Sequence, residues 1–262
     1  MCGRYRLSRR KQVVEEYFDS ASDEPEWTPS YNIAPTQPVV TIRQLESTRV
    51  LSKMRWGLIP SWSSDISVGA SLINARGETV LQKPAFRDCF QRRRCLIPAD
   101  GFYEWKKAGQ NRDPLHFGMK DDSLFAIAGI WDCWKSPTGQ VIESCSILTT
   151  TPNELLTDVH LRMPVILPPR HYDVWLTAPA SEAQRLAELL LPFDSNLMRR
   201  HWVRSFVNKP QNDTPECAME APSPVNSSAA LVITRRPQFP SSPILIISMQ
   251  TFRRVQAVAA SD

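Results

Sequence analysis

The sequence predicts an α+β fold that is mainly β: a curved, mostly antiparallel sheet or barrel with a few helices at its periphery. About ten short segments are rich in β-branched and aromatic residues or alternate apolar with polar residues, as strands do. Only three segments have helical spacing or helix-capping signals. So few helices among so many strands argue against a parallel, doubly wound sheet.

Three helices are predicted beside the strands. The first covers residues 8–18, with Ser8 as its N-cap and apolar residues recurring on one face. The second begins at Thr151, where Thr, Pro and Glu occupy the N-cap, N1 and N3 positions, and it ends just before His160. The third covers residues 181–190. The predicted strands cover residues 39–43, 50–56, 72–76, 94–98, 102–106, 115–119, 124–131, 145–149, 163–167 and 202–207.

The composition divides the chain into a domain at residues 1–220 and a tail at residues 221–262. Hydrophobic residues make up 42% of the 262 residues, which is enough for the core of one large domain. Proline, serine and alanine dominate the tail, so it is expected to be loosely ordered. An apolar run at residues 244–247 leaves a second interpretation open, in which the tail adds an edge strand or docks on a partner.

Net charge alone does not indicate a polyanionic partner, because 31 Lys and Arg face 27 Asp and Glu for a formal charge of +4. The placement of the basic residues is more informative. Five of the first eleven residues are basic, and a second basic group contains Arg87, Arg92, Arg93 and Arg94. Together these groups could line a phosphate-binding face, or they could be two solvated surfaces.

Neither the cysteines nor the histidines have the spacing of a metal site. The six cysteines include no CxxC pair, and the four histidines show no HExxH or other paired-ligand spacing. We therefore expect no metal and no cofactor, with the thiols reduced in a cytoplasmic protein. No apolar run approaches the ~18 residues that a membrane span needs, so no membrane contact is expected.

The first residues, Met1-Cys2-Gly3-Arg4-Tyr5, carry a distinctive chemical signal. Removal of Met1 would leave Cys2 with a free α-amine and a thiol on adjacent carbons. The ordinary pKa values of these groups are about 8 and about 8.5, so a useful fraction of each is reactive near neutral pH. Such a residue can capture an aldehyde as a Schiff base and then close a five-membered thiazolidine ring. The alternative is a cysteine that only packs as a small hydrophobe.

Two stretches combine aromatic or polar residues in patterns that suit nucleic-acid contacts. Trp56 and Trp62 flank a proline turn; Trp56 is expected in the core, whereas Trp62 is followed by polar residues and could present a stacking surface for a base. Asn74 and Arg76 lie on one face of a predicted strand. They could orient a sugar hydroxyl and clamp a phosphate, or they could form a solvent-facing polar edge.

Two further stretches contain groups suited to proton transfer. Glu104 lies among aromatic residues, and such surroundings tend to raise a carboxyl pKa. His160 could move protons near neutral pH, with Arg162 two residues away as a phosphate ligand. Each group also has an alternative interpretation without a catalytic role. Glu104 could be a surface residue on an alternating strand, and His160 could be a structural histidine.

Six motifs occur in one order: Met-Cys-Gly-Arg-Tyr, Tyr-Asn-Ile-Ala-Pro, Trp-Gly-Leu-Ile-Pro-Ser-Trp, Asn-Ala-Arg-Gly-Glu, Cys-Leu-Ile-Pro-Ala-Asp-Gly-Phe-Tyr-Glu-Trp and His-Leu-Arg-Met-Pro. Together they resemble the SOS-response-associated peptidase (SRAP) family, the abasic-site processing proteins. The resemblance extends from Cys2 to about Cys217. One motif alone would be weak evidence, but six in sequence are specific. Leu161 departs from the pattern, because a polar residue is expected there.

The resemblance implies a compact β-rich fold with a positively charged groove. It also implies a protein that recognises abasic sites in single-stranded DNA and links itself covalently to them. Cys2 would then be the nucleophile, and Asn74 would hold the sugar and the linkage. Glu104 would orient or deprotonate the amine, and His160 would move protons during ring opening and reversal. The implied DNA contacts are Arg4, Pro35, Trp62, Arg76 and Arg162.

Two other functions stay open. The Cys2 thiol could attack the peptide bond after Met1, which would make the chain an N-terminal-nucleophile autopeptidase. Alternatively, the aromatic residues and arginines could form a single-strand binding module without chemistry. In the covalent interpretation we expect a monomer, associated with the nucleoid if it is bacterial, whose replication or repair partners the sequence does not identify.

Overall fold

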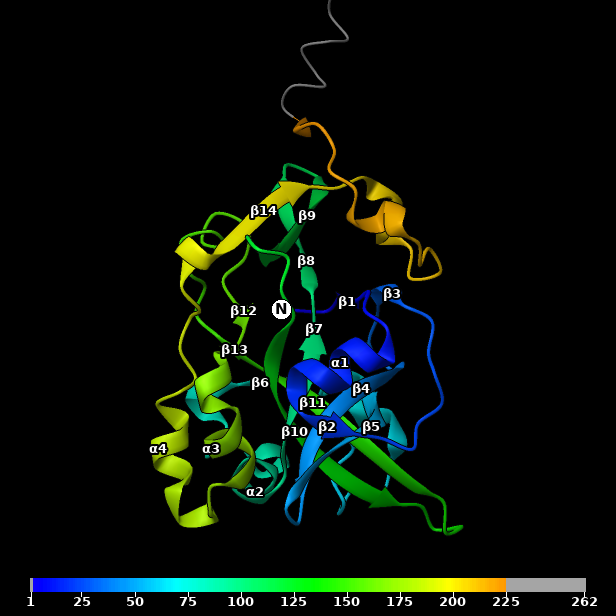
Figure 1. Cartoon of the computed structure of the whole chain (residues 1–262), viewed down its shortest axis with the longest axis vertical. Coiled ribbons are helices and arrows are strands. Elements are labelled where there is room, and N and C mark those ends of the chain that lie inside the picture. Colours follow the sequence, from blue (N-terminus) through cyan, green and yellow to red (C-terminus); the bar gives the residue numbers. More distant parts are fainter. Residues whose placement is uncertain (1, 225–262) are drawn as a thin grey trace, which may run out of the picture. The chain divides into compact units, whose positions relative to one another are not determined.

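Two β-sheets form the framework of residues 2–224, the part of the chain that the computed structural model describes (Figure 1). In the nine-stranded sheet, β11, β10, β7, β4 and β5 pair in that order, and β5 pairs again with β11. These five strands therefore close into a barrel, and each of them pairs with a neighbour on both sides. They are β4 (Pro38–Leu45), β5 (Thr48–Trp56), β7 (Arg94–Ala99), β10 (Phe125–Lys135) and β11 (Val141–Thr150).

Four short strands extend the barrel wall, with β6 and β12 on β11, β13 on β10, and β2 on β5. They are β2 (Ser20–Ala21), β6 (Asn74–Arg76), β12 (Met163–Pro164) and β13 (Ile166–Leu167). The second sheet has the order β14-β9-β8-β1-β3, and all its pairs are antiparallel. Its strands are β1 (Tyr5–Leu7), β3 (Ser30–Ile33), β8 (Gly101–Ala108), β9 (Asn111–Met119) and β14 (Met198–Trp202).

The helices are short and peripheral, which together with the two sheets confirms the predicted β-rich α+β class. Within residues 2–224 the α-helices are α1 (Lys11–Phe18), α2 (Pro84–Arg92), α3 (Tyr172–Thr177) and α4 (Ala183–Ala187). Figure 1 shows α2, α3 and α4 gathered on one side of the barrel. No helix in this part of the chain is long and apolar enough to cross a membrane. Residues 225–262, most of the predicted tail, lie outside the described residues.

Aromatic packing joins the N-terminal strand to the barrel. Tyr5 of β1 and Trp56 of β5 are both fully buried, and their rings meet edge to face at 5.4 Å between centroids. Such a pair contributes about 0.5–1.5 kcal/mol beyond the burial of its surface. The Trp56 indole also donates to the carbonyl oxygen of Ile73 at 2.9 Å. Trp56 is therefore the core residue that the sequence predicts.

The first helix begins at Lys11 and not at Ser8, because Ser8 has another partner. Its backbone N–H and its hydroxyl both donate to the Asp100 carboxylate, so Ser8 cannot cap the helix. Arg10 takes the N-cap position without a side-chain bond. The predicted helix at residues 181–190 is also shorter, because only Ala183–Ala187 is α-helical.

The predicted helix ahead of His160 is wrong, because residues 153–160 form successive turns. The N–H groups of four residues bond to only two carbonyl oxygens, those of Asn153 and Leu156, so a regular i→i+4 ladder does not develop. The Asn153 side chain also donates to the carbonyl oxygen of Phe193 at 2.8 Å, which fixes the start of the turns.

The predicted strand at residues 202–207 is wrong for most of its length. β14 ends at Trp202, and the chain then turns away from the sheet into a 3-10 helix at Ser205–Asn208. Val207 and Cys217 pack against Tyr103 on the outer face of the five-stranded sheet. Apolar residues in this stretch therefore cover the sheet instead of extending it.

The members of the second basic group differ in exposure, because Arg87 and Arg92 lie on the surface whereas Arg94 is built into the fold. Arg92 and Arg93 both pair with Asp88. Arg94 is only 5% exposed. Its guanidinium donates to carbonyl oxygens at the C-terminal ends of α2 and α3, where a cation is favoured by the helix dipoles. These acceptors belong to Phe90, Gln91, Trp175 and Ala178.

We expect Arg94→Ala to lower the free energy of unfolding by about 3 kcal/mol or more, because four carbonyl oxygens lose a charged donor. Urea denaturation measures this change. Arg87→Ala is the control, since Arg87 is an exposed member of the same basic group and its loss should change stability by less than about 0.5 kcal/mol. Equal effects of the two substitutions would contradict the structural role of Arg94.

Candidate active site

Cys2 lies where the two sheets meet, and it is fully buried. β1 pairs with β8 in an antiparallel register, so the residues before β1 run alongside the Glu104 part of β8. From the barrel, the side-chain amide of Asn74 donates to the Cys2 carbonyl oxygen at 2.8 Å. The structure therefore brings three of the predicted site residues, Cys2, Asn74 and Glu104, to one place.

Asn74 sits on β6, which pairs with β11 in a parallel register. Ala75 faces the core and is fully buried, so Asn74 and Arg76 lie on the other face of this short strand. The Asn74 Oδ1 atom is buried and accepts no hydrogen bond from the described residues. A buried acceptor beside Cys2 without a donor is a binding position for a ligand hydroxyl or N–H.

Glu104 is only 3% exposed, and burial raises the pKa of its carboxyl group to about 7. The direction agrees with the expectation from its aromatic neighbours in the sequence. A carboxyl group with this pKa is partly protonated at neutral pH. It can therefore both give and accept a proton during one reaction.

Burial also raises the pKa of the Cys2 thiol, and the charge of Glu104 adds to this effect. A hydrogen bond from the Arg4 backbone N–H opposes it but is a smaller influence. The thiol is therefore protonated at neutral pH. A protonated thiol is a weak nucleophile, so the Cys2 sulfur is not activated for attack at this pH.

His160 is half-buried at the end of the turns, and burial lowers its pKa. Its Nδ1 atom lies 3.0 Å from the backbone N of Arg162 and 3.2 Å from the Arg162 carbonyl oxygen. The first contact suits the tautomer protonated on Nε2, and the second suits the tautomer protonated on Nδ1. Both contacts orient the ring, and the lowered pKa keeps the imidazole in the neutral form, which can accept a proton.

Arg162 is held by an acidic residue to which the sequence analysis gave no role. Its two terminal nitrogens donate to the two Glu78 carboxylate oxygens at 2.6 and 2.8 Å, and one of them also donates to the Thr149 carbonyl oxygen at 2.5 Å. The Arg162 guanidinium in turn lowers the pKa of Glu78. Arg76, by contrast, is exposed. The two arginines predicted to bind phosphate therefore differ in how available they are.

Trp62 is 68% exposed because its neighbours in the turn are fixed. The Ser61 N–H donates to Asp132 at 2.9 Å, and the Ser63 carbonyl oxygen accepts from the Trp134 indole at 2.7 Å. An exposed tryptophan on such a rigid turn is a ready stacking surface. This arrangement suits the role expected for Trp62.

The turn that contains Pro35 is joined to the same strand end. The backbone N–H of Thr36 donates to the Trp56 carbonyl oxygen at 2.8 Å, and the Trp56 N–H donates to the Gln37 carbonyl oxygen at 2.9 Å. Pro35 itself is half-exposed. Pro35, between β3 and β4, is thus held against the end of β5, and Trp62 lies on the segment that follows β5.

Arg4 is engaged inside the protein. One terminal nitrogen donates to Asn32 Oδ1 at 2.7 Å and to the Val207 carbonyl oxygen at 2.9 Å. Its guanidinium also lies over the Trp105 ring, 5.7 Å from the centroid. These contacts hold the Arg4 guanidinium within the fold, whereas the expectation from the sequence was a contact with a DNA phosphate.

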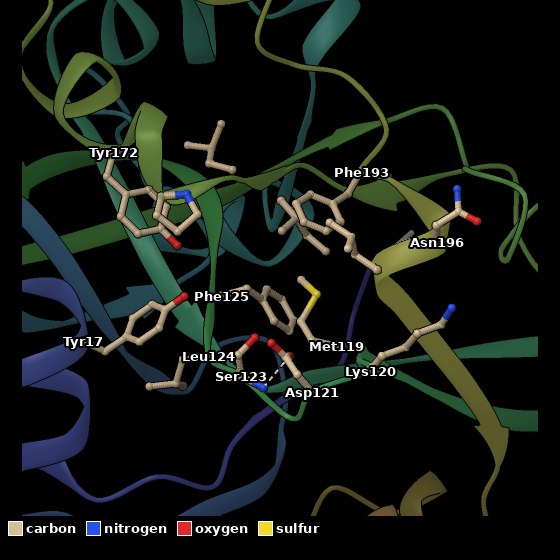
Figure 2. A pocket seen from close by; sticks show the side chains of 14 residues that line it. Tyr17, Met119, Lys120, Asp121, Ser123, Leu124, Phe125, Tyr172, Phe193 and Asn196 are labelled. Carbon is tan, nitrogen blue, oxygen red and sulfur yellow. Dashed lines mark hydrogen bonds between the residues drawn. The ribbon is translucent and has the colours of Figure 1, made fainter.

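The predicted site residues do not line the cavity beside α1 and α3. This cavity of about 490 Å³ lies among α1, α3 and the β9–β10 turn, and Figure 2 shows Tyr17, Tyr172, Phe125 and Phe193 around it. Its lining contains neither Cys2 nor any other predicted site residue. Within residues 2–224, no three His, Cys, Asp or Glu side chains come together as a metal site would require.

We expect Glu104→Gln to stabilise the protein, and to do so more at pH 8 than at pH 5. The pKa of Glu104 is raised by folding from an ordinary value near 4.3, so stability present below pH ~4 is lost as the pH rises through about 7. Glutamine avoids this loss, which is at most about 4 kcal/mol for a shift of this size.

Urea denaturation from pH 5 to pH 8 measures the effect of Glu104→Gln. Glu188→Gln is the control, because Glu188 is exposed and should show little dependence on pH. A stability difference between the Glu104 variant and the parent protein that stays constant over this range would contradict the raised pKa.

Comparison with known proteins agrees with the geometry. The sequence matches the family described as SOS response associated peptidase (SRAP) over residues 1–210. Abasic site processing protein YoqW of Bacillus subtilis (strain 168) is 43% identical over 219 residues, which cover 82% of this chain and 98% of that protein. Abasic site processing protein HMCES of Mus musculus is 33% identical over 271 residues, which cover 84% of this chain and 76% of that protein.

A solved structure supports the same relationship. The crystal structure of a protein from Bacteroides thetaiotaomicron matches this fold with a TM-score of 0.77 and 29% sequence identity, over 84% of this chain and 100% of that chain. The resemblance carried by the six sequence motifs is thereby confirmed. This chain belongs to the SRAP family.

Proposed function

We propose that this chain acts on abasic sites in single-stranded DNA, and that Cys2, once Met1 is removed, forms a covalent thiazolidine link with the sugar of the lesion. The names of its relatives, abasic site processing proteins, support this substrate. One observation carries the chemistry. Cys2 is buried between the Asn74 amide and Glu104, whose carboxyl pKa is about 7.

The first step is capture of the sugar aldehyde by the Cys2 amine. An abasic deoxyribose is mostly a closed hemiacetal, so ring opening requires an acid and a base. The protonated form of Glu104 can give its proton to the ring oxygen, and the neutral His160 imidazole can accept the proton of the hemiacetal hydroxyl. The amine then adds to the aldehyde carbon, and loss of one water leaves a Schiff base. The free Oδ1 of Asn74 can accept a hydrogen bond from a sugar hydroxyl during this step.

The second step closes the ring. The Cys2 sulfur bonds to the former aldehyde carbon, the electron pair of the C=N double bond returns to nitrogen, and the thiol proton is transferred to that nitrogen through Glu104. Because the thiol pKa is raised, the sulfur reacts only after the electrophilic iminium has formed. Closure removes the iminium that would otherwise promote β-elimination and strand scission. The finished adduct therefore shields the lesion.

A surface for the flanking DNA extends from this site. Arg76 is exposed for contact with a phosphate, and Trp62 and Pro35 lie on turns that can stack on or wedge between neighbouring bases. Unpaired bases can reach such aromatic surfaces, whereas stacked bases of a duplex cannot. This arrangement supports single-stranded DNA as the partner, and one chain supplies every residue in the proposal.

An autopeptidase is the weaker enzymatic alternative. The family description contains the word peptidase, and hydrolysis of the bond after Met1 would expose the Cys2 amine. Attack on an amide needs a thiolate, however, and burial raises the pKa of the Cys2 thiol. Peptidase activity is therefore limited in this proposal to self-processing. A purely non-covalent binding module would leave the raised pKa of Glu104 beside Cys2 without a role.

The Cys2 amine and thiol should be separable by two variants. Cys2→Ala keeps an N-terminal amine, so it should form a Schiff base that borohydride traps and that leads to strand scission, but no stable adduct. A protein that retains Met1 or carries an N-terminal tag has the thiol without the amine, so it should form neither species. Denaturing gels with abasic single-stranded DNA measure both products, with intact DNA as the control. Adduct formation by the tagged protein would contradict the thiazolidine mechanism.

Arg76 and Arg162 should contribute unequally to the salt dependence of DNA binding. Each phosphate contact adds about −0.7 to the slope of log affinity against log salt for a single strand. Arg76→Ala should flatten the slope by about this amount, whereas Arg162→Ala should have a smaller effect because Glu78 already neutralises Arg162. Fluorescence anisotropy with a tetrahydrofuran abasic analogue, which has no aldehyde, measures the slopes. Glu78→Gln should steepen the slope; an unchanged slope in this variant would show that Glu78 does not compete with DNA.

A further inference from the structure

Arg4 follows Cys2 by two residues, and its guanidinium is hydrogen-bonded within the protein. It donates to Asn32 and to the Val207 carbonyl oxygen, at 2.7 and 2.9 Å, and it lies over the Trp105 ring. Both bonds use Nη1, and Nε is buried, so a phosphate could take two N–H groups of this side chain only by displacing one of these oxygens or by shifting the guanidinium. Arg4 is therefore poorly arranged to bind DNA, although the family resemblance suggests that role.

Asn32 connects Arg4 to the chain that follows β14. Asn32 is 1% exposed, and its Oδ1 accepts the hydrogen bond from Arg4. Its Nδ2 lies within hydrogen-bond distance of three carbonyl oxygens, those of Val207, Lys209 and Asn212, at 3.1, 3.0 and 2.6 Å. An amide supplies both the donors and the acceptor that this arrangement requires, whereas an ionised carboxylate supplies acceptors only.

The backbone of Arg4 is hydrogen-bonded to the sheet, in addition to the bonds of its side chain. Its carbonyl oxygen accepts from the Tyr103 N–H at 2.9 Å, which continues the pairing of β1 with β8. Between Arg4 and the Asn74 bond to Cys2 there is only Gly3, the residue with the fewest backbone restrictions. Chain ends normally fray, so an anchor on Arg4 decides how far Cys2 can move.

We propose that Arg4 is a positioning residue for the reacting N-terminus, locked by Asn32 and the loop at residues 207–212, and that it is not a DNA ligand. The inference rests on the proposed function, because it concerns where the Cys2 amine is held for attack. Misplacement of a reacting group by about 1 Å can slow a reaction about 10²-fold. The lock also gives a role to the chain segment after β14, which makes no predicted contact with DNA.

Arg4→Lys is the decisive variant. Lysine keeps the positive charge and can still bind a phosphate, but it lacks the planar guanidinium that lies over Trp105 while Nη1 bonds to Asn32 and Val207. We expect the rate of adduct formation at saturating abasic DNA to fall about 10- to 100-fold. The affinity for the tetrahydrofuran analogue and its salt slope should stay unchanged. Arg10→Ala is the matched control, an exposed arginine near the same terminus that should leave the adduct rate unaltered.

A double-mutant cycle tests whether Arg4 and Asn32 act together. If they form one lock, Arg4→Lys and Asn32→Leu combined should slow the adduct little more than either alone. A DNA-binding Arg4 would give additive effects and a near-normal rate in Arg4→Lys. That outcome, or a slope flattened by about 0.7 in Arg4→Met, would overturn the proposal.

Two controls keep the test decisive. Thermal unfolding identifies any variant that does not fold, and if Asn32→Leu is among them the rate and salt slope of Arg4→Lys alone decide. The parent protein separates this inference from the proposed function. If it forms no adduct with abasic DNA, the proposed function fails, whereas a normal parent with an unaffected Arg4→Lys variant refutes only the positioning role.

Discussion

The site depends on the pairing of β1 with both β8 and β3, which turns the start of the chain into an interior strand. A residue near a chain terminus is usually solvated, but Cys2 is fully buried here. The pairing needs a close approach at Gly101, opposite Arg6, because a Cβ there would lie 2.0 Å from His116 Nε2. Since Asn74 comes from the barrel and Glu104 from the other sheet, the site forms only when the two sheets have come together.

Burial then sets the protonation of the site. The pKa of Cys2 and that of Glu104 are raised, and the pKa of His160 is lowered, and in each case burial is the largest cause. All three shifts favour the neutral form, because a charge in a poorly solvated place is costly. In the proposed mechanism, these neutral groups would open the sugar and let the amine attack, and the raised thiol pKa would hold the sulfur back until an iminium has formed. The proposed order of the two bonds would then follow from burial.

The sequence predicts local features of this protein better than long-range partners. Most strand positions, the buried Trp56 and the exposed Trp62 follow from alternation and from neighbouring turns, which are local. The helix α2 was missed although Pro84 at its first turn is a start signal.

The misassigned elements have a common cause in partners distant along the chain. Ser8 fails to cap α1 because it bonds to Asp100, and the turns before His160 are fixed in part by Phe193. No pattern in one sequence shows such a partner. The boundary at residue 220 and the roles of the individual site residues stay predictions that only solution experiments address.

Several basic residues have partners within the protein that the sequence alone does not reveal. Arg6 and Arg9 both pair with Asp100, Arg162 is paired with Glu78, and Arg94 is used by helix carbonyl oxygens. Of the three arginines expected to bind DNA, only Arg76 is exposed, so the phosphate contacts near Cys2 are few and their contribution should weaken in salt. Non-covalent binding of this kind exchanges readily, and a lesion would soon be released. The proposed covalent link to Cys2 would remove that limit, because retention would then depend on the stability of the thiazolidine and not on the number of cations around it.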